Sequence, residues 1–457
     1  MQNSFQFIIN VAACAATACA QPANDTALIA PFVDAETTEQ FDNVATAYLA
    51  DIEALALPDL ALSFIENLDN LGTAENLNEE AAFFAKHETA LSKIDSKKLS
   101  MCDRIDHSIM SNDIRLGAER AELGLRYLAT PKRDSEPASL YAAALGEEWY
   151  RHFLARWNGA EIDPDKLFAF GEAALKKSVA TYDRVIKEMG YADNAAGLAA
   201  EFASEKYHLS DEEKLSVFFA ERQDIIWKNL GNLFASDYGV ERATITLSNR
   251  GAEFPVPGWY ERDTGTFFYN IFDETFDTRQ GDWLLLHEAT PGHHFQVNAS
   301  LNAPKCNGRF AGQFVPAYAE GWAAYVETLS SDLGLTRTPG EKLAAIEWDM
   351  VRSVRVALDV ALNAYGWSDE QAMDYWRENV RGQEDVAARE IARMKRWPAQ
   401  VVTYKYGADV FGRLKDEYAG DGPSDEIRAY HDAVLTYGAM PLGVFEDLLP
   451  EMLPGGK

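Results

Sequence analysis

Basic residues are scarce in this sequence relative to acidic ones. The 457 residues include 42 Lys and Arg against 72 Asp and Glu, which gives a formal net charge of -30 at pH 7. A surface of this sign repels nucleic-acid phosphates and anionic lipids. The composition therefore argues against a nucleic-acid partner. A solvated acidic surface is the simplest interpretation of the charge, although neutral or cationic substrates would also suit it.

Cysteine is scarcer still. Two of the four cysteines fall within the first 22 residues, and only Cys102 and Cys306 follow. Two cysteines so far apart are not the pattern of a disulfide framework, and they are not the pattern of a metal cluster either. The sequence therefore predicts that the fold depends neither on disulfides nor on a cysteine metal cluster.

Long apolar runs are absent after an N-terminal leader. The segment 1–22 (MQNSFQFIINVAACAATACAQP) has a short apolar stretch followed by small residues, which is typical of a secretory signal. Its ATAC part resembles a bacterial lipobox, although no Lys or Arg precedes the apolar stretch and Ala16 replaces the usual Leu. No later run approaches the ~18 apolar residues that span a bilayer. We therefore expect an exported protein, periplasmic or tethered through a lipidated Cys19, with an ordinary terminal tail as the alternative.

The helical period dominates the rest of the chain. Between residues 30 and 240, stretches such as FDNVATAYLADIEALAL place apolar residues three and four apart, which predicts a helical N-terminal part. Residues 242–273 alternate instead and are rich in Thr, Tyr, Phe and Gly, which predicts two or three short strands. The helical pattern then resumes to the end. We expect a mainly α fold with one small sheet, in which residues 30–240 and 241–457 form one continuous structure.

Histidine is rare but clustered. Three of the eight histidines lie in residues 281–296, GDWLLLHEATPGHHFQ. A His-Glu pair on a helix resembles the zinc-protease signature, in which two histidines one turn apart hold the metal and the glutamate is the general base. This pattern predicts a Zn²⁺ ligand at His287 and a general base at Glu288.

The second histidine ligand depends on how the chain passes Pro291. In an unbroken helix His294 shares a face with His287 but lies about 10.5 Å away along the axis, which is too far for a comfortable pair. If Pro291 and Gly292 loop out as an insertion, His293 acquires the usual spacing. We therefore predict His293 as the second ligand, keep His294 as the alternative, and otherwise expect His294 to contact the substrate or transition state.

The third ligand is expected on a later helix. Residues 317–329, AYAEGWAAYVETL, place Glu320 and Glu327 two helical turns apart on one face. The small residues beside Glu320 would let a neighbouring helix approach closely. We predict Glu320 as the ligand and Glu327 as an outer-shell or structural alternative.

Four motifs in this order resemble a known bacterial family. They are HExxPGHHxQ at 287–296, YAEGWA at 318–323, RxxLD with GWS at 355–368, and PAQxxxYxxG at 398–407. The chain resembles the family called "domain of unknown function 885", which is similar to the gluzincin peptidases. The resemblance implies a large helical zincin-like (gluzincin) fold with a small sheet beside the metal-binding helix, and many members are exported lipoproteins. Asn363 departs from the family, because many relatives carry His there.

Two further side chains within these motifs suggest functional roles. Tyr404 could donate a hydrogen bond to the oxyanion that forms when a carbonyl is attacked, or it could simply pack in the interior. Arg355 could pair with Asp359 one turn on, or it could clamp a substrate carboxylate.

Together these residues predict a zinc hydrolase, most simply a peptidase. The strand around 267–270, with Tyr269 and Asn270, is expected beside the metal helix, where a peptide substrate could pair with it by edge addition. One alternative is an exported metal-binding or ligand-binding lipoprotein without turnover. Another is a zinc hydrolase of non-peptide amides or esters. Glu288 favours catalysis, because a binding site needs no general base.

Overall fold

The computed structural model describes residues 33–131, 137–250, 256–272, 274–306, 308–310, 315–335 and 337–455. The predicted leader, with Cys19, lies outside these residues. The described chain is mainly helical, as predicted. The helices are α1 (Ala35–Leu55), α2 (Phe64–Asp69), α3 (Ala74–Leu91), α4 (Met101–Leu128), α5 (Gly146–Asn158), α6 (Pro164–Glu188), α7 (Ala195–Phe202), α8 (Glu212–Asn229), α9 (Gly281–Glu288), α10 (His293–Asn302), α11 (Pro316–Val326), α12 (Pro339–Asn363), α13 (Asp369–Asn379), α14 (Ala387–Arg396), α15 (Val402–Tyr418), α16 (Asp425–Thr436) and α17 (Leu442–Met452). The strands are β1 (His208–Leu209), β2 (Thr244–Leu247), β3 (Gly258–Glu261), β4 (Thr266–Tyr269) and β5 (Phe276–Asp277).

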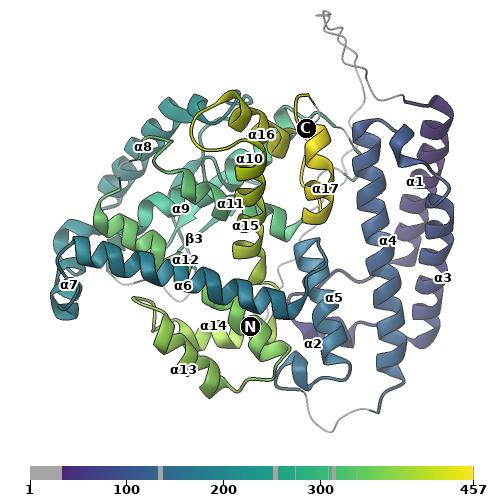
Figure 1. Cartoon of the computed structure of the whole chain (residues 1–457), viewed down its shortest axis with the longest axis horizontal. Coiled ribbons are helices and arrows are strands. Elements are labelled where there is room, and N and C mark those ends of the chain that lie inside the picture. The colour runs from purple at the N-terminus through teal and green to yellow at the C-terminus, as the bar shows by residue number, and fades with distance from the viewer. Residues whose placement is uncertain are drawn as a thin grey trace, which may run out of the picture.

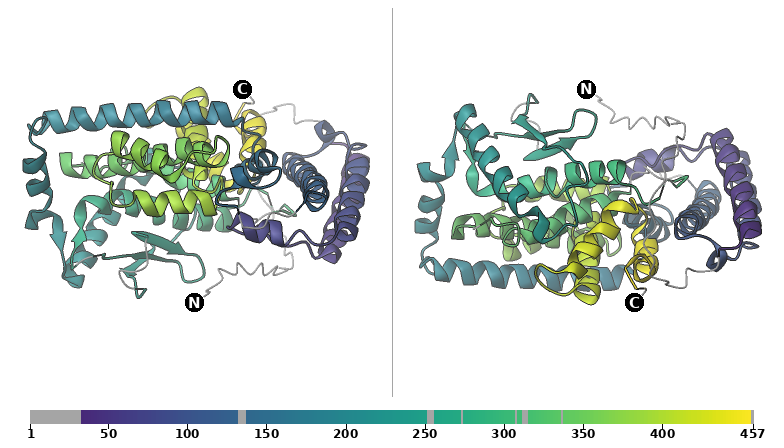
Figure 2. Two further views of the ribbon diagram at one scale, coloured as in Figure 1. Left: turned by 90° about the horizontal axis from the view of Figure 1, so that it is seen from below. Right: turned by 90° about the horizontal axis from the view of Figure 1, so that it is seen from above.

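The central helix of the molecule is α12. A capping box starts it, in which the backbone N–H of Thr338 donates to Glu341 and the backbone N–H of Glu341 donates to the Thr338 hydroxyl. Every residue from 350 to 363 is buried, because α6, α14 and α15 pack around this helix. The long α6 lies along one side of the body and the three-stranded sheet along the opposite side (Figure 2). Among the helices of the described residues, none has both the length and the apolar composition needed to cross a membrane.

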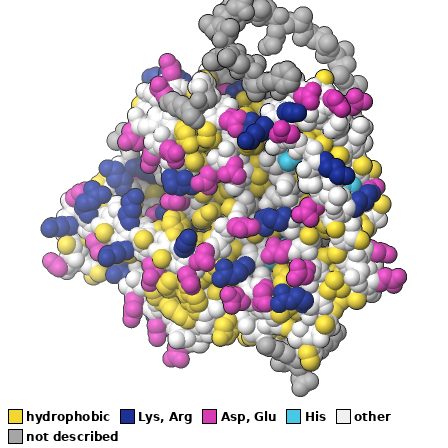
Figure 3. Space-filling model, turned by 45° about the vertical axis from the view of Figure 1, so that its right-hand side comes forward, with side chains coloured by type: hydrophobic (Ala, Val, Ile, Leu, Met, Phe, Trp, Pro, Cys, Tyr) yellow, Lys and Arg dark blue, Asp and Glu magenta, His cyan; other side chains and the backbone are white. Residues whose placement is uncertain are grey.

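The N-terminal helices form a layer at one end of the molecule. In Figure 1, α1, α3 and α4 stand side by side at the right, while α9, α10, α11 and α15 meet near the middle. The largest apolar core runs through both regions, from Phe41 of α1 to Leu449 of α17. Acidic and basic side chains are interspersed over the face shown in Figure 3, so the negative charge is spread rather than gathered there.

The residues predicted as strands form a three-stranded sheet in the order β2-β4-β3. β4 lies in the middle, parallel to β2 and antiparallel to β3. This corrects the expectation that the strand around 267–270 offers a free edge, because both of its sides are already paired. The outer strand that contacts α9 is β3. A period of two reveals a strand but not its neighbours, so the sequence could not give this order.

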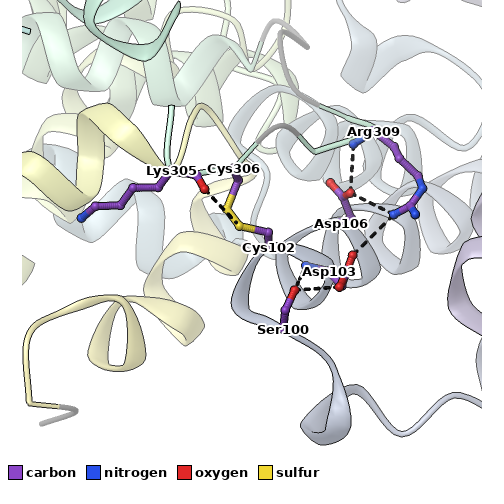
Figure 4. Close-up of a disulfide and its surroundings, with 7 residues drawn as sticks. All are labelled: Ser100, Cys102, Asp103, Asp106, Lys305, Cys306 and Arg309. Carbon is purple, nitrogen blue, oxygen red and sulfur yellow. Dashed lines mark hydrogen bonds and ion pairs between the residues drawn. A yellow bond between two sulfur atoms is a disulfide. The ribbon is translucent and has the colours of Figure 1, made fainter. Parts of the chain in front are cut away.

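Cys102 and Cys306 form a disulfide, which corrects the prediction that they serve no such purpose. They are separated by 204 residues, yet their Cα atoms lie 5.3 Å apart. Beside the disulfide, the backbone N–H of Arg309 donates to the Asp106 carboxylate at 2.9 Å, and its guanidinium faces Asp103 (Figure 4). The segment between α10 and α11 is therefore tied to α4. Sequence separation carries no information on this proximity, which tertiary packing creates.

Candidate metal centre

The helix that carries the His-Glu pair ends where the sequence predicts a break. α9 finishes at Glu288 and α10 begins at His293, with Pro291 and Gly292 between them. Pro291 has no backbone N–H to continue the helix, and a Cβ on Gly292 would lie 1.8 Å from the carbonyl oxygen of His287. Only glycine fits at position 292. The prediction that Pro-Gly interrupts the helix is confirmed.

The break turns His293 towards the first histidine. The rings of His287 and His293 meet edge to face, with their centroids 4.8 Å apart. Glu320 Oε2, from α11, lies 3.5 Å from His287 Nε2 and 3.4 Å from His293 Nε2. One donor atom from each of the three residues lies within 4.8 Å of the other two. The structure thus brings together the three side chains predicted as metal ligands.

Two of the donor-atom distances match the spacing of ligands around one zinc ion. Zinc binds nitrogen and oxygen ligands at about 2.0–2.2 Å in a tetrahedron, which places neighbouring ligand atoms roughly 3.3–3.5 Å apart. The two distances from Glu320 Oε2 agree with this spacing. His293 and Glu320 keep 16% and 19% of their side-chain surface exposed, so a small molecule can reach them. Two imidazoles and one carboxylate are also the protein ligands of one class of catalytic zinc site.

Glu320 reaches the histidines because α11 packs closely against its neighbours. The indole N–H of Trp322 donates to the carbonyl oxygen of Pro291 at 2.8 Å, which joins α11 to the break between α9 and α10. On another side α11 crosses α15, and a Cβ on Gly321 would lie 2.5 Å from the Cα of Gly407. The prediction that small residues beside Glu320 allow a close helix approach is confirmed.

A second carboxylate fixes the ring of His287. Glu327 Oε1 lies 2.7 Å from His287 Nδ1, and the Arg352 guanidinium donates two hydrogen bonds, of 2.6 and 2.7 Å, to the same carboxylate. Nδ1 is therefore occupied and Nε2 faces Glu320, an arrangement common for metal-binding histidines. Although burial acts to raise it, Arg352 and His287 hold the pKa of Glu327 below its ordinary value. Glu327 thus lies where a residue that supports a ligand would lie, which is the alternative role predicted for it from the sequence.

These residues carry more negative than positive charge. Glu288, Glu320 and Glu327 contribute three carboxylates, and the bidentate pair with Arg352 balances one of them. Although burial acts to lower it, hydrogen bonds with Glu320 and Glu327 raise the pKa of His287 to about 10. The surroundings therefore favour positive charge at the centre of the cluster, and a divalent cation would supply it.

Glu288 lies beside the cluster without being one of its three donors. It is buried, and its carboxylate accepts a hydrogen bond from the backbone N–H of Tyr260 in β3. Burial raises the pKa of this carboxyl, while His287 and His293 act in the opposite direction. A carboxyl whose pKa is moved towards neutrality is suited to accept a proton and return it.

Tyr404 reaches the site from α15. It lies one helical turn before Gly407, so the crossing of α11 and α15 carries it towards the histidines. Its ring is nearly parallel to that of His287, at a centroid distance of 6.3 Å. Burial and the Glu320 charge raise the pKa of the phenol, while Arg393 opposes them. The phenol therefore keeps its proton at neutral pH and can donate a hydrogen bond.

Arg355 does not pair with Asp359, which corrects one of its two expected roles. Its Nε donates to Glu390 of α14 at 2.8 Å, because the side chain turns towards that helix. Asp359 instead accepts from the Tyr150 hydroxyl at 2.7 Å and from the backbone N–H of Ala399 at 2.9 Å. The aspartate of the RxxLD motif thus fixes the chain that enters α15.

Asn363 also has structural partners. Its amide donates to the carbonyl oxygens of Asp359 and Met394, both at 3.1 Å, and its side-chain oxygen accepts from the backbone N–H of Leu140. The residue is fully buried. Asparagine at this position therefore joins α12, α14 and the segment before α5.

His294 faces away from Glu320. Its Nε2 lies 2.8 Å from the carbonyl oxygen of Glu241, and its ring packs edge-on against Tyr260. Since the backbone N–H of Tyr260 binds Glu288, His294 supports the strand beside the base. A direct contact of His294 with substrate stays a prediction.

Tyr269 and Asn270 take part in the sheet. Tyr269 is buried against Phe219 and Phe276. The backbone N–H of Asn270 donates to the carbonyl oxygen of Pro257 at 2.8 Å. These contacts place Tyr269 in the core and Asn270 at the end of the β3–β4 pairing, and a role of either in substrate binding stays a prediction.

Three residues of the site lie outside the four sequence motifs and were not predicted from the sequence. They are Arg352, Tyr260 and Arg393. Arg352 could have been found, because two arginines in the apolar stretch VRSVRVAL require buried partners. Tyr260 and Arg393 stand in ordinary strand and helix surroundings, and only the tertiary structure brings them to the site.

The chain is similar to a protein family and to several solved structures. The family of bacterial proteins of unknown function DUF885 matches residues 125–449, which include all four motifs. A candidate lipoprotein from Colwellia psychrerythraea is 20% identical with a TM-score of 0.60, over 90% of this chain and 74% of that one. A candidate lipoprotein of unknown function from Shewanella oneidensis is 15% identical with a TM-score of 0.64, over 90% and 99%. These structures share the fold. None of the curated proteins matches the chain.

Proposed function

The chain belongs to the bacterial protein family of unknown function DUF885, and we propose that it is a zinc-dependent hydrolase, in the simplest case a peptidase, with a zincin-like (gluzincin) fold. One observation carries the proposal. The donor atoms of His287, His293 and Glu320 cluster within 4.8 Å, Glu320 lies at zinc-ligand spacing from both histidines, and Glu288 lies beside them in a buried site.

The ligands in this proposal are His287, His293 and Glu320, and a bound Zn²⁺ would supply Lewis-acid chemistry that polarises a carbonyl and makes water more acidic. Glu288 accepts the proton of the attacking water and returns it to the leaving amine. Tyr404 donates its phenol hydrogen bond to the oxyanion that forms at the carbonyl. Glu327 keeps His287 in the orientation that the site requires.

The outer edge of β3 is the place where an extended peptide would pair. Asn270 donates to Pro257, so in the alternating antiparallel pattern Tyr260 and its partner Phe267 form a pair without mutual hydrogen bonds. The backbone groups of Tyr260 therefore point away from β4, and its N–H indeed binds Glu288. A peptide on this edge would lie beside the base.

The alternative of a binding lipoprotein without turnover explains the metal donors but leaves Glu288 without a purpose. A base held in a buried position beside the donors is a requirement of hydrolysis and not of binding. A zinc hydrolase of other amides or esters would need the same residues, so the substrate has to be identified by experiment.

The proposal is tested by metal analysis of the purified protein together with cleavage of a mixed peptide library. We expect about one zinc per chain, cleavage that stops when a chelator removes the zinc, and recovery when zinc is restored. Ester and non-peptide amide substrates form a parallel assay. Zinc without turnover in any assay would favour the binding alternative, and the absence of both zinc and turnover would contradict the proposal.

We also propose that the protein is exported and tethered through Cys19. The leader pattern supports this, as do the two structural relatives that are described as candidate lipoproteins. The disulfide between Cys102 and Cys306 adds support, since such bonds persist mainly in oxidising compartments. Cys19→Ser should move the protein from the membrane fraction to the soluble fraction of the exported material. An unchanged distribution would show that Cys19 is not the anchor.

A further inference from the structure

Arg393 of α14 lies next to the candidate centre and has an unused hydrogen-bond donor. Its guanidinium donates to the Gln400 side chain at 2.7 Å and shares a hydrogen bond with the Tyr404 hydroxyl. Among the residues that the structure describes, its buried Nε has no acceptor. Nε is closed off from solvent, but the side chain as a whole keeps 22% of its surface exposed, so a ligand can reach another part of the guanidinium.

The carboxylate nearest to Arg393 is shared with other arginines. Arg355 and Arg393 both face one carboxylate, that of Glu390, with the nearest N–O distances at 2.8 and 3.8 Å. The 2.8 Å contact belongs to Arg355, so Glu390 is a weak partner for Arg393. A partly desolvated guanidinium whose nearest carboxylate is distant and shared favours an anionic ligand. Its planar set of N–H groups matches the geometry of a carboxylate.

The geometry points to Arg393 as the group that binds the C-terminal carboxylate of a peptide substrate. This inference rests on the proposed function and names its substrate class. A free α-carboxylate is the one anion that every unmodified peptide carries, whatever its sequence. The enzyme would therefore act from the C-terminus and would not require an acidic side chain.

The position of Arg393 limits how far the carboxylate lies from the reacting bond. The Tyr404 hydroxyl would donate to the oxyanion while it also contacts the guanidinium that holds the carboxylate. Three hydrogen bonds of about 2.8 Å, together with the width of the guanidinium between two of them, span at most roughly 11 Å. Three extended residues span roughly 10 Å. The scissile bond would thus lie within the last few residues before the C-terminus, and the product would be a free amino acid, a dipeptide or a tripeptide.

The kinetic test compares one peptide with a free C-terminus, its C-terminal amide, and an amidated variant that ends in Glu. For the wild type we expect kcat/KM for the free peptide to exceed that for the amide by roughly 10- to 100-fold, mainly through KM, because hydrogen bonds to charged groups have this effect. Arg393→Gln should lose the preference, so that within this variant kcat/KM for the free peptide falls to the value for the amide. A preference that survives in Arg393→Gln would overturn the inference, as would a wild type that cleaves the free peptide and the amide equally.

Arg389→Gln is the matched control. Arg389 lies on the same helix and faces the same Glu390, at 3.6 Å, but its side chain is 42% exposed. This variant should keep the preference of the wild type. If the amidated peptide ending in Glu is cleaved as well as the free peptide, the recognised carboxylate belongs to a side chain, and the assignment to the C-terminus is wrong.

A binding measurement separates this inference from the proposed function. Titration calorimetry of the full-length protein with a dipeptide and with its amide requires no turnover. Tighter binding of the free dipeptide to the wild type, lost in Arg393→Gln, supports the carboxylate site even if no peptide is hydrolysed. Equal binding of the dipeptide and its amide would contradict the site even if hydrolysis is observed.

Discussion

His293 and His294 are neighbours in the chain but face different partners. Successive residues of a helix point about 100° apart, so both cannot readily bind one ion. His293 Nε2 lies 3.4 Å from Glu320, whereas His294 Nε2 lies 2.8 Å from the carbonyl oxygen of Glu241. The step at Gly292 decides which of the two meets His287.

This difference predicts opposite effects of two adjacent substitutions. His293→Ala should strip the zinc, because two remaining protein ligands make a poor site. His294→Ala should keep the zinc and reduce activity roughly 10- to 100-fold, because the strand that carries Tyr260 loses its support beside Glu288. Zinc content and activity of the two purified variants check this. Zinc lost only from His294→Ala would mean that the assignment of the two histidines is reversed.

Single residues of the site could be predicted where local spacing determines them. His287, His293 and Glu320 follow from a histidine pair on an interrupted helix and from small residues beside a glutamate, and the structure brings their side chains together. Arg355 shows the limit of such reasoning. An aspartate one turn away is a good local partner, but a glutamate 35 residues further along the chain takes its place. Whether an arginine pairs with a carboxylate nearby in the sequence or with a distant one depends on how the helices pack, which the sequence does not reveal.

Two helices place the catalytic candidates with respect to each other. α11 and α15 cross where Gly321 meets Gly407, next to Glu320 and one turn after Tyr404. Two of the four motifs thus each contribute one glycine to the contact between α11 and α15. Each glycine lies within one helical turn of a candidate functional residue, so the close contact between the helices also positions Glu320 and Tyr404.

Gly407→Ala should therefore disturb both stability and activity. The new Cβ would lie 2.5 Å from the carbonyl oxygen of Ala317, so the two helices must separate. We expect a loss of about 1–3 kcal/mol in the free energy of unfolding, as for other overpacked sites, together with a lower kcat as Tyr404 moves. Urea unfolding and steady-state kinetics would measure the two effects.

Gly412→Ala in the same helix serves as the control. A Cβ there meets no atom within 4 Å, so alanine should stabilise α15 by roughly 0.5–1 kcal/mol through helix propensity. Activity should not change. If Gly407→Ala behaved like Gly412→Ala, the close crossing would not be what positions Tyr404.

The elements themselves were more predictable than their order. The change from helical to alternating pattern predicted the strands between 242 and 273, and three strands lie there. The pattern could not tell that β4 is central, because strand order depends on which segments meet in space. The edge proposed for peptide binding is therefore that of β3, because β4 has no free edge.

At the scale of the whole molecule, the disulfide joins the N-terminal layer to the centre of the site. Cys306 follows α10, which carries His293, and precedes α11, which carries Glu320. Its bond to Cys102 of α4 and the contacts of Arg309 with Asp106 hold this connecting segment. The helices that carry His293 and Glu320 are thus braced by a part of the chain that contributes no residue to the candidate site.

Removal of this disulfide should destabilise the protein. Cys102→Ser with Cys306→Ser should lower the free energy of unfolding by about 2–5 kcal/mol, because the unfolded chain loses a cross-link that closes a long loop. Thermal unfolding with and without a reducing agent checks this. The wild type should melt earlier when reduced, while the double variant should not respond. A wild type that melts at the same temperature in both conditions would contradict the expected role of the bond.

The most direct test of the central claim is the activity of Glu288→Gln at measured zinc content. The amide has nearly the same size and can still accept the hydrogen bond from Tyr260, but it cannot take up a proton. We therefore expect a folded variant with the zinc content of the wild type and a kcat reduced roughly 10²- to 10⁴-fold, the usual contribution of a general base. Near-normal turnover by the zinc-loaded variant would contradict the proposed mechanism.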